Sequence, residues 1–241
     1  MMILVNEAFS DGSLGDHASL DLRNIGTGAW PRILKSCRAK DLRLYHITLK
    51  SLDGIEGLSE TNELVLEWAT KVEQLDPVFR LTHLTKLSVY DFPKLTALTG
   101  IEQLGELTEL NLSGSRGAID PSLRLSTIKP VTRIPSLKSF SLANAKIADD
   151  DIACLAECST LRSLHLSKDF DRSQFALLAK RLNGQLEKPI VAYMATNLEC
   201  KQCGGTKVMF YGRRMPFLCR VCEEAKFQKL LSEFETMVRN A

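Results

Sequence analysis

The sequence has little net charge and few residues that break regular structure. Its formal charge is only +2 over 241 residues, which is too small to produce the strong positive field of a protein held on nucleic acid mainly by phosphate contacts. Glycine and proline, at 14 and 8 residues, are too scarce to indicate disorder. The hydrophobic fraction of 44% is typical of a chain that folds into a globular protein.

Targeting and membrane segments are also missing from the pattern. The first residues, MMILVNEAFSDG, contain an apolar stretch too short for a signal-peptide core or a membrane span, and no basic residues precede it. We therefore expect a cytoplasmic protein without a membrane partner.

The sequence lacks the common catalytic motifs. It contains no GxSxG elbow, no GxxxxGK(S/T) loop, no GxGxxG turn and no HExxH pair. One catalytic alternative is a hydrolase in which His46 acts with Asp91 or Glu67, and it requires these side chains to lie within hydrogen-bond reach. We expect a protein that is not an enzyme.

An apolar phrase, LxL or a close variant, recurs along most of the chain. Its seven copies start at Leu20, Leu42, Leu64, Leu87, Leu110, Phe140 and Leu164, which are 22, 22, 23, 23, 30 and 24 positions apart. All intervals but one fall within the 20 to 29 residues typical of leucine-rich repeats. Strands of a βαβ protein would need units of roughly 30 or more residues, so short repeats are favoured.

Residues 20 to about 186 therefore resemble leucine-rich-repeat proteins. The resemblance implies an α/β repeat solenoid in which a curved parallel sheet is built from stacked units that share one core. The asparagine that usually follows the strand in this family is replaced, for example by Ile47 and Ala69, so the backbone there needs other hydrogen-bond partners. The long interval contains a segment at about 118–130 that we expect to leave the solenoid as a loop.

The outward positions of the strands predict a binding surface in repeats two to four. Aromatic side chains ringed by charges suit a protein interface, because rigid rings bury a large area while charges set orientation. The predicted partner-binding residues are Arg43, Tyr45, His46, Glu67, Trp68, Tyr90 and Asp91. In the alternative interpretation, Trp68 and Tyr90 fold against the solenoid edge and fill gaps in its core.

Four of the seven cysteines form two CxxC pairs near the C-terminus. Cys200 and Cys203 are followed after 15 residues by Cys219 and Cys222, a spacing typical of a tetrahedral structural metal site. Four thiolates would leave no open position for substrate. We therefore predict one structural Zn²⁺ ion held by these cysteines.

The segment around these cysteines resembles a treble-clef or zinc-ribbon finger. Residues 207–210 and 215–218 read as a hairpin, and residues 223–239 read as an amphipathic helix. Fingers of this kind bind nucleic acid, bind protein, or serve only as structural caps. The predicted division is a solenoid with an N-terminal cap at 1–195 and a small zinc-stabilised α+β finger at 196–241.

Two functions remain open. The first is a protein-interaction module that binds its partner on the concave face, as a scaffold, an effector or a toxin-neutralising immunity protein. The second is a nucleic-acid-associated regulator that uses the basic hairpin of the finger, whose candidate residues are Lys207, Arg213, Arg214 and Arg220. A solvated hairpin rim would explain these charges equally well.

Overall fold

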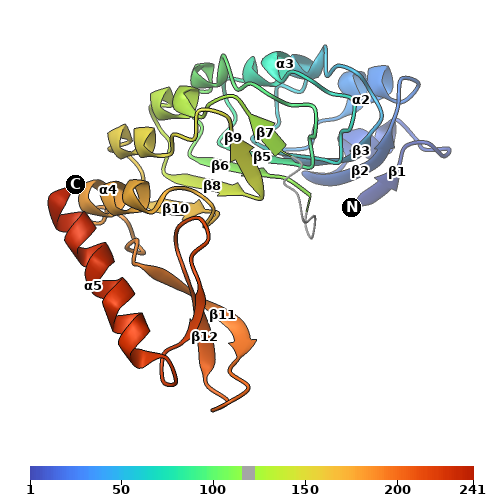
Figure 1. Ribbon diagram of the computed structural model, residues 1–241. Helices are drawn as coiled ribbons and strands as arrows, with labels where there is room; N and C mark the ends of the chain where they lie inside the picture. Colours follow the sequence, from blue (N-terminus) through green and yellow to red (C-terminus); the bar gives the residue numbers. More distant parts are fainter. Residues whose placement is uncertain (116–122) are drawn as a thin grey trace. The chain divides into compact units, whose positions relative to one another are not determined.

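The computed structural model describes residues 1–115 and 123–241, and it divides into two compact units, Met1–Asp150 and Asp151–Ala241. Figure 1 shows the strands and helices of both. The boundary expected near residue 195 falls inside the second unit. The division into domains at 1–195 and 196–241 therefore stays a prediction.

A parallel sheet forms the body of the first unit. Each strand pairs with the next one in the order β1-β2-β3-β4-β5-β6-β8. The strands are β1 (Met2–Leu4), β2 (Ser19–Ile25), β3 (Asp41–Ile47), β4 (Glu63–Glu67), β5 (Lys86–Tyr90), β6 (Glu109–Ser113) and β8 (Ser139–Ala143). The six apolar phrases of this unit coincide with β2 to β6 and β8, which confirms the predicted repeat, while β1 adds a strand that the phrase does not mark.

Short helices connect the strands and line the other side of the unit (Figure 1). Among the described residues of this unit, no helix exceeds seven residues, which is why most repeats need only 22 or 23 residues instead of the longer βαβ unit. They are α1 (Gly12–Gly15), α2 (Trp30–Ser36), η1 (Ile55–Gly57), α3 (Asp76–Phe79), η2 (Ile101–Gln103) and η3 (Lys129–Arg133).

The strand register stacks equivalent leucines into one core. Leu20 pairs with Leu42, and Leu42 with Leu64, while the intervening residues Asp21 and Arg43 also face one another. The leucines of these pairs are 0 to 2% exposed. Burial of a leucine contributes roughly 1.5–3 kcal/mol, and because neighbouring repeats supply the walls, the stabilisation is shared between units.

A left-handed residue follows several of the strands. A φ between 46° and 63° is found at Asn24, His46, Trp68, Asp91 and Asn144. Strand alternation would otherwise point His46 into the core and Ile47 outward. Instead Tyr45 and His46 are both partly exposed, and Ile47 is 1% exposed. The left-handed turn thus places two consecutive side chains on the open face of the sheet.

The same turn supplies the backbone partners that an asparagine ladder would provide. The Ile47 N–H donates to the Trp68 carbonyl at 2.9 Å, and the Ala69 N–H donates to the Asp91 carbonyl at 3.2 Å. Ile47 and Ala69 are therefore each tied to the left-handed residue of the following repeat.

The expected loop at about 118–130 is only partly a loop. Residues 118–122 lie outside the described part of the chain. Leu123–Leu125 instead forms β7, which pairs in parallel with β9 (Ala145–Ile147). Leu123 and Leu125 are 0 and 1% exposed, so the prediction was wrong for β7, because its two leucines bury more apolar surface in the core than a solvated loop could.

The second unit contains the last repeat phrase and the finger. β10 (Ser163–Leu166) carries the phrase, and η4 (Ala153–Glu157) and α4 (Arg172–Leu182) flank it. An antiparallel sheet follows, with the order β11 (Tyr193–Glu199), β12 (Thr206–Phe210) and β13 (Phe217–Cys219), and α5 (Glu224–Asn240) ends the chain. The hairpin and the helix agree with the sequence prediction, whereas β11 was not expected.

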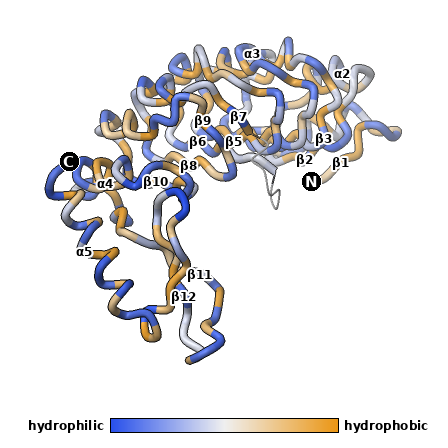
Figure 2. Tube along the Cα trace, in the orientation of Figure 1, coloured by the Kyte–Doolittle hydropathy of each residue, from blue (hydrophilic) through white to orange (hydrophobic). Residues whose placement is uncertain are grey.

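Helix α5 packs against α4 within this unit. Figure 2 shows hydrophobic and hydrophilic residues alternating along α5. Phe227 and Phe234, from its apolar stripe, are each 3% exposed. Arg172 of α4 forms an ion pair with Glu233 at 3.3 Å and donates to the Leu230 carbonyl. The stripe is therefore used internally.

Candidate binding face and metal centre

The outward residues of the first unit align in columns across the sheet. Register pairs Arg23 with Tyr45, Tyr45 with Glu67 and Glu67 with Tyr90. The left-handed residues His46, Trp68 and Asp91 follow in the same strand order. Because neighbouring strands lie about 4.8 Å apart, side chains in one column lie next to one another, and all seven predicted partner-binding residues lie on this face.

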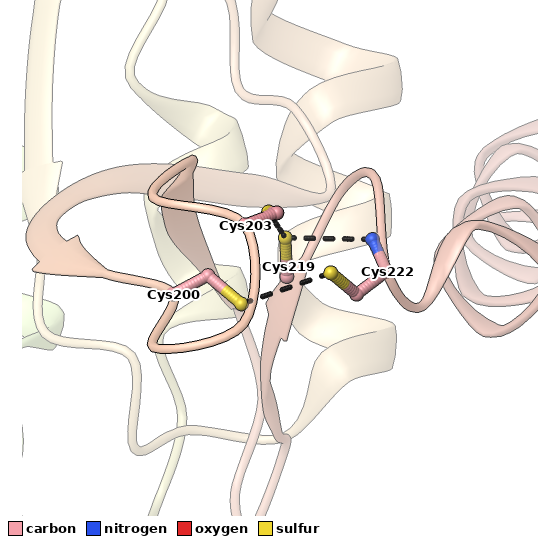
Figure 3. Close-up of side chains that lie close together, drawn as sticks. All are labelled: Cys200, Cys203, Cys219 and Cys222. Atoms are coloured by element: carbon pink, nitrogen blue, oxygen red, sulfur yellow. Dashed lines mark hydrogen bonds between the residues drawn. The ribbon is translucent and has the colours of Figure 1, made fainter.

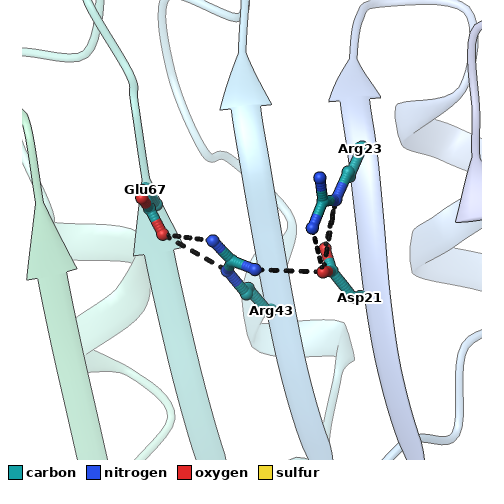
Figure 4. Close-up of polar contacts among 4 residues, drawn as sticks. All are labelled: Asp21, Arg23, Arg43 and Glu67. Atoms are coloured by element: carbon teal, nitrogen blue, oxygen red, sulfur yellow. Dashed lines mark hydrogen bonds and ion pairs between the residues drawn. The ribbon is translucent and has the colours of Figure 1, made fainter. Parts of the chain in front are cut away.

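A chain of charged side chains crosses three strands (Figure 4). Arg43 on β3 contacts Asp21 on β2 at 3.0 Å and Glu67 on β4 at 2.6 Å. Arg23 also contacts Asp21, at 2.8 Å. Partial burial tends to raise the pKa of Asp21, but the hydrogen bonds and charges of Arg23 and Arg43 outweigh it, and the net pKa is lowered. The network holds Arg43 and Glu67 in place.

Aromatic rings lie next to this network. The rings of His46 and Trp68 stack with centroids 4.2 Å apart, and the Tyr45 ring lies 5.7 Å from that of Trp68. The guanidinium groups of Arg23 and Arg43 lie over the Tyr45 ring at 5.1 and 5.2 Å. The surface therefore already contains guanidinium groups packed on an aromatic face.

A hollow of about 300 Å³ opens beside these rings. Its lining consists of Tyr45, Glu67, Trp68, Tyr90, Asp91, Gly114 and Ser115. Trp68 remains 40% exposed there. The sequence pattern identified five of these residues, but not Gly114 and Ser115, because small residues after a strand carry no signal of their own.

The geometry does not support the hydrolase alternative. The Nδ1 atom of His46 lies 2.7 Å from the Oδ1 atom of Asn24, and one face of its ring covers Trp68. In the described part of the chain, His46 has no hydrogen bond or ion pair with Glu67 or Asp91. The histidine is held by a neighbouring amide and a ring, without the carboxylate partner that the hypothesis needs.

The four cysteines of the CxxC pairs form one cluster (Figure 3). Their Sγ atoms all lie within 4.8 Å of one another, with Cys203 and Cys219 3.4 Å apart and Cys200 and Cys222 3.9 Å apart. A tetrahedral ion with bonds of about 2.3 Å would separate its sulfur ligands by about 3.8 Å. The arrangement fits one shared metal ion, whereas a disulfide requires sulfur atoms only about 2 Å apart.

Backbone N–H groups beside Cys219 favour its thiolate form. The N–H groups of Cys222 and Val221 point to the Cys219 sulfur and lower its pKa to about 6. Gly204 has a φ of +70°, and a Cβ at Gly205 would lie 3.3 Å from the Cys203 sulfur. The two glycines thus permit the tight turn behind the first pair.

The four basic residues of the finger do not lie in one group. Lys207 on β12 pairs with Cys219 on β13, and Arg220 lies over the rings of Tyr193 and Phe227 at 5.8 and 5.4 Å. Arg213 and Arg214 are in the turn of the hairpin. The pKa of Asp171 is lowered mainly by its hydrogen bonds to Ser173 and also by the nearby charge of Arg213.

No family model matches the sequence. The register of one leucine phrase per parallel strand decides the architecture. The fold is that of a leucine-rich-repeat solenoid.

Among solved structures, the chain is similar to an internalin C2 from Listeria monocytogenes, with 17% identity and a TM-score of 0.45 over 62% of this chain and 61% of that one. It is also similar to a leucine-rich-repeat protein from Leptospira interrogans, with 21% identity and a TM-score of 0.45 over 68% of this chain and 39% of that one. The solenoid chain spans less than two thirds of either protein.

Proposed function

We propose that this chain is a non-catalytic interaction module that binds a protein partner on the concave face of its solenoid. The contact would centre on Tyr45, Trp68 and Tyr90, with Arg43, His46, Glu67 and Asp91 around them. Interface hot spots combine aromatic anchors with charged side chains in this way.

The observation that carries the proposal is the conformation of Trp68. Its backbone has a φ of 58°, which costs a bulky residue about 1–3 kcal/mol. Despite this cost, the side chain remains 40% exposed. A ring that served only to fill the core would be buried, so we favour a ring that is presented for contact with a partner.

The charged network supports the same proposal. Arg43 is anchored on both sides, by Asp21 and by Glu67. Side chains that are already ordered lose less entropy when a partner binds. The face would therefore bind as a largely preformed surface.

We propose that the cysteine cluster holds one structural Zn²⁺ ion. Four sulfur ligands from Cys200, Cys203, Cys219 and Cys222 suit this ion, and binding it would add folding free energy to a short segment.

Free cysteines in this number also suit a reducing compartment such as the cytoplasm. In the described residues, no helix is long and apolar enough to cross a membrane.

The nucleic-acid alternative, a regulator that binds through Lys207, Arg213, Arg214 and Arg220, has less support. The Arg213 charge acts on Asp171, and Arg220 is packed over two aromatic rings. Scaffold, effector and immunity roles are all consistent with a binding face of this kind, and the identity of the partner separates them.

Affinity capture with the full chain tests the proposal. The bait would be the natural sequence and a Trp68→Ala, Tyr90→Ala variant whose folding is checked by circular dichroism, each with and without nuclease. We expect a protein that is retained after nuclease and lost with the variant. Equal capture by both chains would refute the concave face, and loss with nuclease alone would favour nucleic acid.

A further inference from the structure

The hollow on the concave face is lined by aromatic rings and acidic groups. Its lining combines three aromatic rings with the carboxylates of Glu67 and Asp91, and none of the described residues that line it is basic. Aromatic faces carry negative partial charge and attract cations. Both features therefore favour a positively charged occupant and oppose an anion.

The two carboxylates differ in how they are compensated. Glu67 is paired with Arg43 at 2.6 Å, so its charge is largely neutralised. Asp91 has no side-chain hydrogen bond or ion pair with any other residue, as far as the chain is described. Its backbone is nevertheless fixed, because its N–H donates to the Ser113 carbonyl at 3.0 Å and its carbonyl accepts from Ala69.

The backbone conformation of Asp91 determines where its carboxylate lies. It follows β5 in the left-handed conformation, with a φ of 57°, and so it lies on the open face beside Tyr90. Trp68 occupies the equivalent position on the neighbouring repeat. A cation in the hollow could therefore lie against the Trp68 ring and pair with Asp91 at the same time.

We propose that the hollow binds the guanidinium group of an arginine side chain presented by the protein partner. This inference rests on the proposed function and specifies what the partner must contribute. The volume of about 300 Å³ is at the lower end for small-ligand pockets, which suits one side chain better than a whole small molecule.

Arginine fits the site better than lysine for two reasons. A guanidinium is planar and weakly hydrated, so it stacks on aromatic rings and loses less solvation in a partly open site, and its fork can pair with both oxygens of one carboxylate. The neighbouring Tyr45 ring already accepts the guanidinium groups of Arg23 and Arg43 at 5.1 and 5.2 Å. The partner's arginine would extend this arrangement into the hollow.

The test titrates the full-length chain with short acetylated and amidated peptides, Gly-Arg-Gly, Gly-Lys-Gly and Gly-citrulline-Gly, while the indole N–H signals are followed by NMR. Citrulline has nearly the shape of arginine without its charge. Trp30 is an internal control, because it is 8% exposed and its Nε1 donates to the Asp53 carbonyl at 2.9 Å.

We expect the arginine peptide to shift the Trp68 signal with a dissociation constant on the order of 10 mM. The lysine peptide should bind several-fold more weakly, and the citrulline peptide and the Trp30 signal should show no saturable shift. Asp91→Asn should weaken arginine binding by about tenfold, whereas Asp41→Asn, an exposed carboxylate outside the hollow, should leave it unchanged.

Equal shifts with arginine and citrulline, no saturable shift with arginine, or full binding by Asp91→Asn would each overturn the inference. Capture of the partner separates this failure from failure of the proposed function. If Trp68→Ala, Tyr90→Ala loses the partner but Asp91→Asn retains it, the face binds a partner without an arginine in the hollow. If both variants retain the partner, the proposed function itself is wrong.

Discussion

His46 stacks on Trp68, with ring centroids 4.2 Å apart and an angle of 24° between the planes. The two residues occupy equivalent places on neighbouring repeats, and both are left-handed, with φ values of 57° and 58°. The stacking restrains the Trp68 ring while leaving part of it exposed. The same backbone conformation at His46 and Trp68 thus brings the two rings together on one surface.

The left-handed backbone makes a prediction about two substitutions at one site. Trp68→Gly and Trp68→Ala both remove the ring, but only glycine adopts a positive φ without steric cost. We expect the glycine variant to be more stable than the alanine variant by about 1 kcal/mol, which is opposite to their order in a regular strand. Urea denaturation of both variants measures the difference, and a more stable alanine variant would show that the turn relaxes.

The carboxylate of Asp21 predicts a dependence of stability on pH. Its pKa is lowered from 3.8 in the folded chain, so its contribution is present above pH 3.8 and is lost as the pH falls through the folded value. At pH 7, Asp21→Asn should lower the free energy of unfolding by about 1 kcal/mol, because the network is partly exposed. The difference should shrink when the measurement is repeated at a pH below the folded pKa of Asp21.

Asp41→Asn is the matched control for that experiment. Asp41 begins the neighbouring strand β3, and in the described chain its exposed carboxylate has no ion pair. We expect the control to match the natural sequence at both pH values. A loss of equal size in both variants would mean that the general charge of the face, rather than the Asp21 network, carries the effect.

Removal of the proposed metal ion should act locally. A strong chelator should increase hydrogen exchange in β11 to β13 and in the first turns of α5. The reason is that the cluster joins the two CxxC pairs, which fix these elements. Exchange in β3 to β5 of the first unit should stay unchanged. The same local effect from Cys203→Ser would support four-cysteine binding, and protection unchanged by either treatment would contradict it.

Alkylation should distinguish the buried thiols of Cys37 and Cys158 from those of the four-cysteine cluster. Burial raises the pKa of the Cys158 thiol to about 11 and also raises that of Cys37. Because the thiolate is the reactive form, neither residue should be modified at pH 8 until the chain unfolds. After chelation, Cys203, which is exposed, should react first. Mass spectrometry of the labelled peptides shows which thiols were modified.

Much of the solenoid could be predicted because its information is local and repeated. Leu42 and Leu44 mark one strand, and the same spacing in the next repeat fixes the register, so the outward columns follow. Strand β1 could not be predicted, because a single apolar MIL segment has no partner in the pattern. Strand β11 reads YMATNLE, which lacks clear alternation, and only its pairing with β12 makes it a strand.

The composition of the candidate binding face could be predicted from the sequence, but its geometry could not. The residue types at Tyr45, Trp68 and Tyr90 indicated contact with a partner, yet nothing in Trp68 signals a left-handed backbone. Asn24, His46, Asp91 and Asn144 are of types that adopt a positive φ more often than most residues, whereas tryptophan is not. The pairing of Arg43 with both Asp21 and Glu67, and the open carboxylate of Asp91, depend on side-chain positions that spacing does not define.

The most direct test compares affinities for the captured partner in two matched variants. Trp68→Ala, Tyr90→Ala changes the concave face, and Arg213→Ala, Arg214→Ala changes the finger hairpin. Titration calorimetry should show a dissociation constant at least about 100-fold larger for the first variant, which corresponds to a loss of about 2.7 kcal/mol of binding free energy from the hot-spot contacts. The second variant should bind as the natural sequence does. The reverse result, with binding lost only when the hairpin arginines are removed, would contradict the concave face as the binding site.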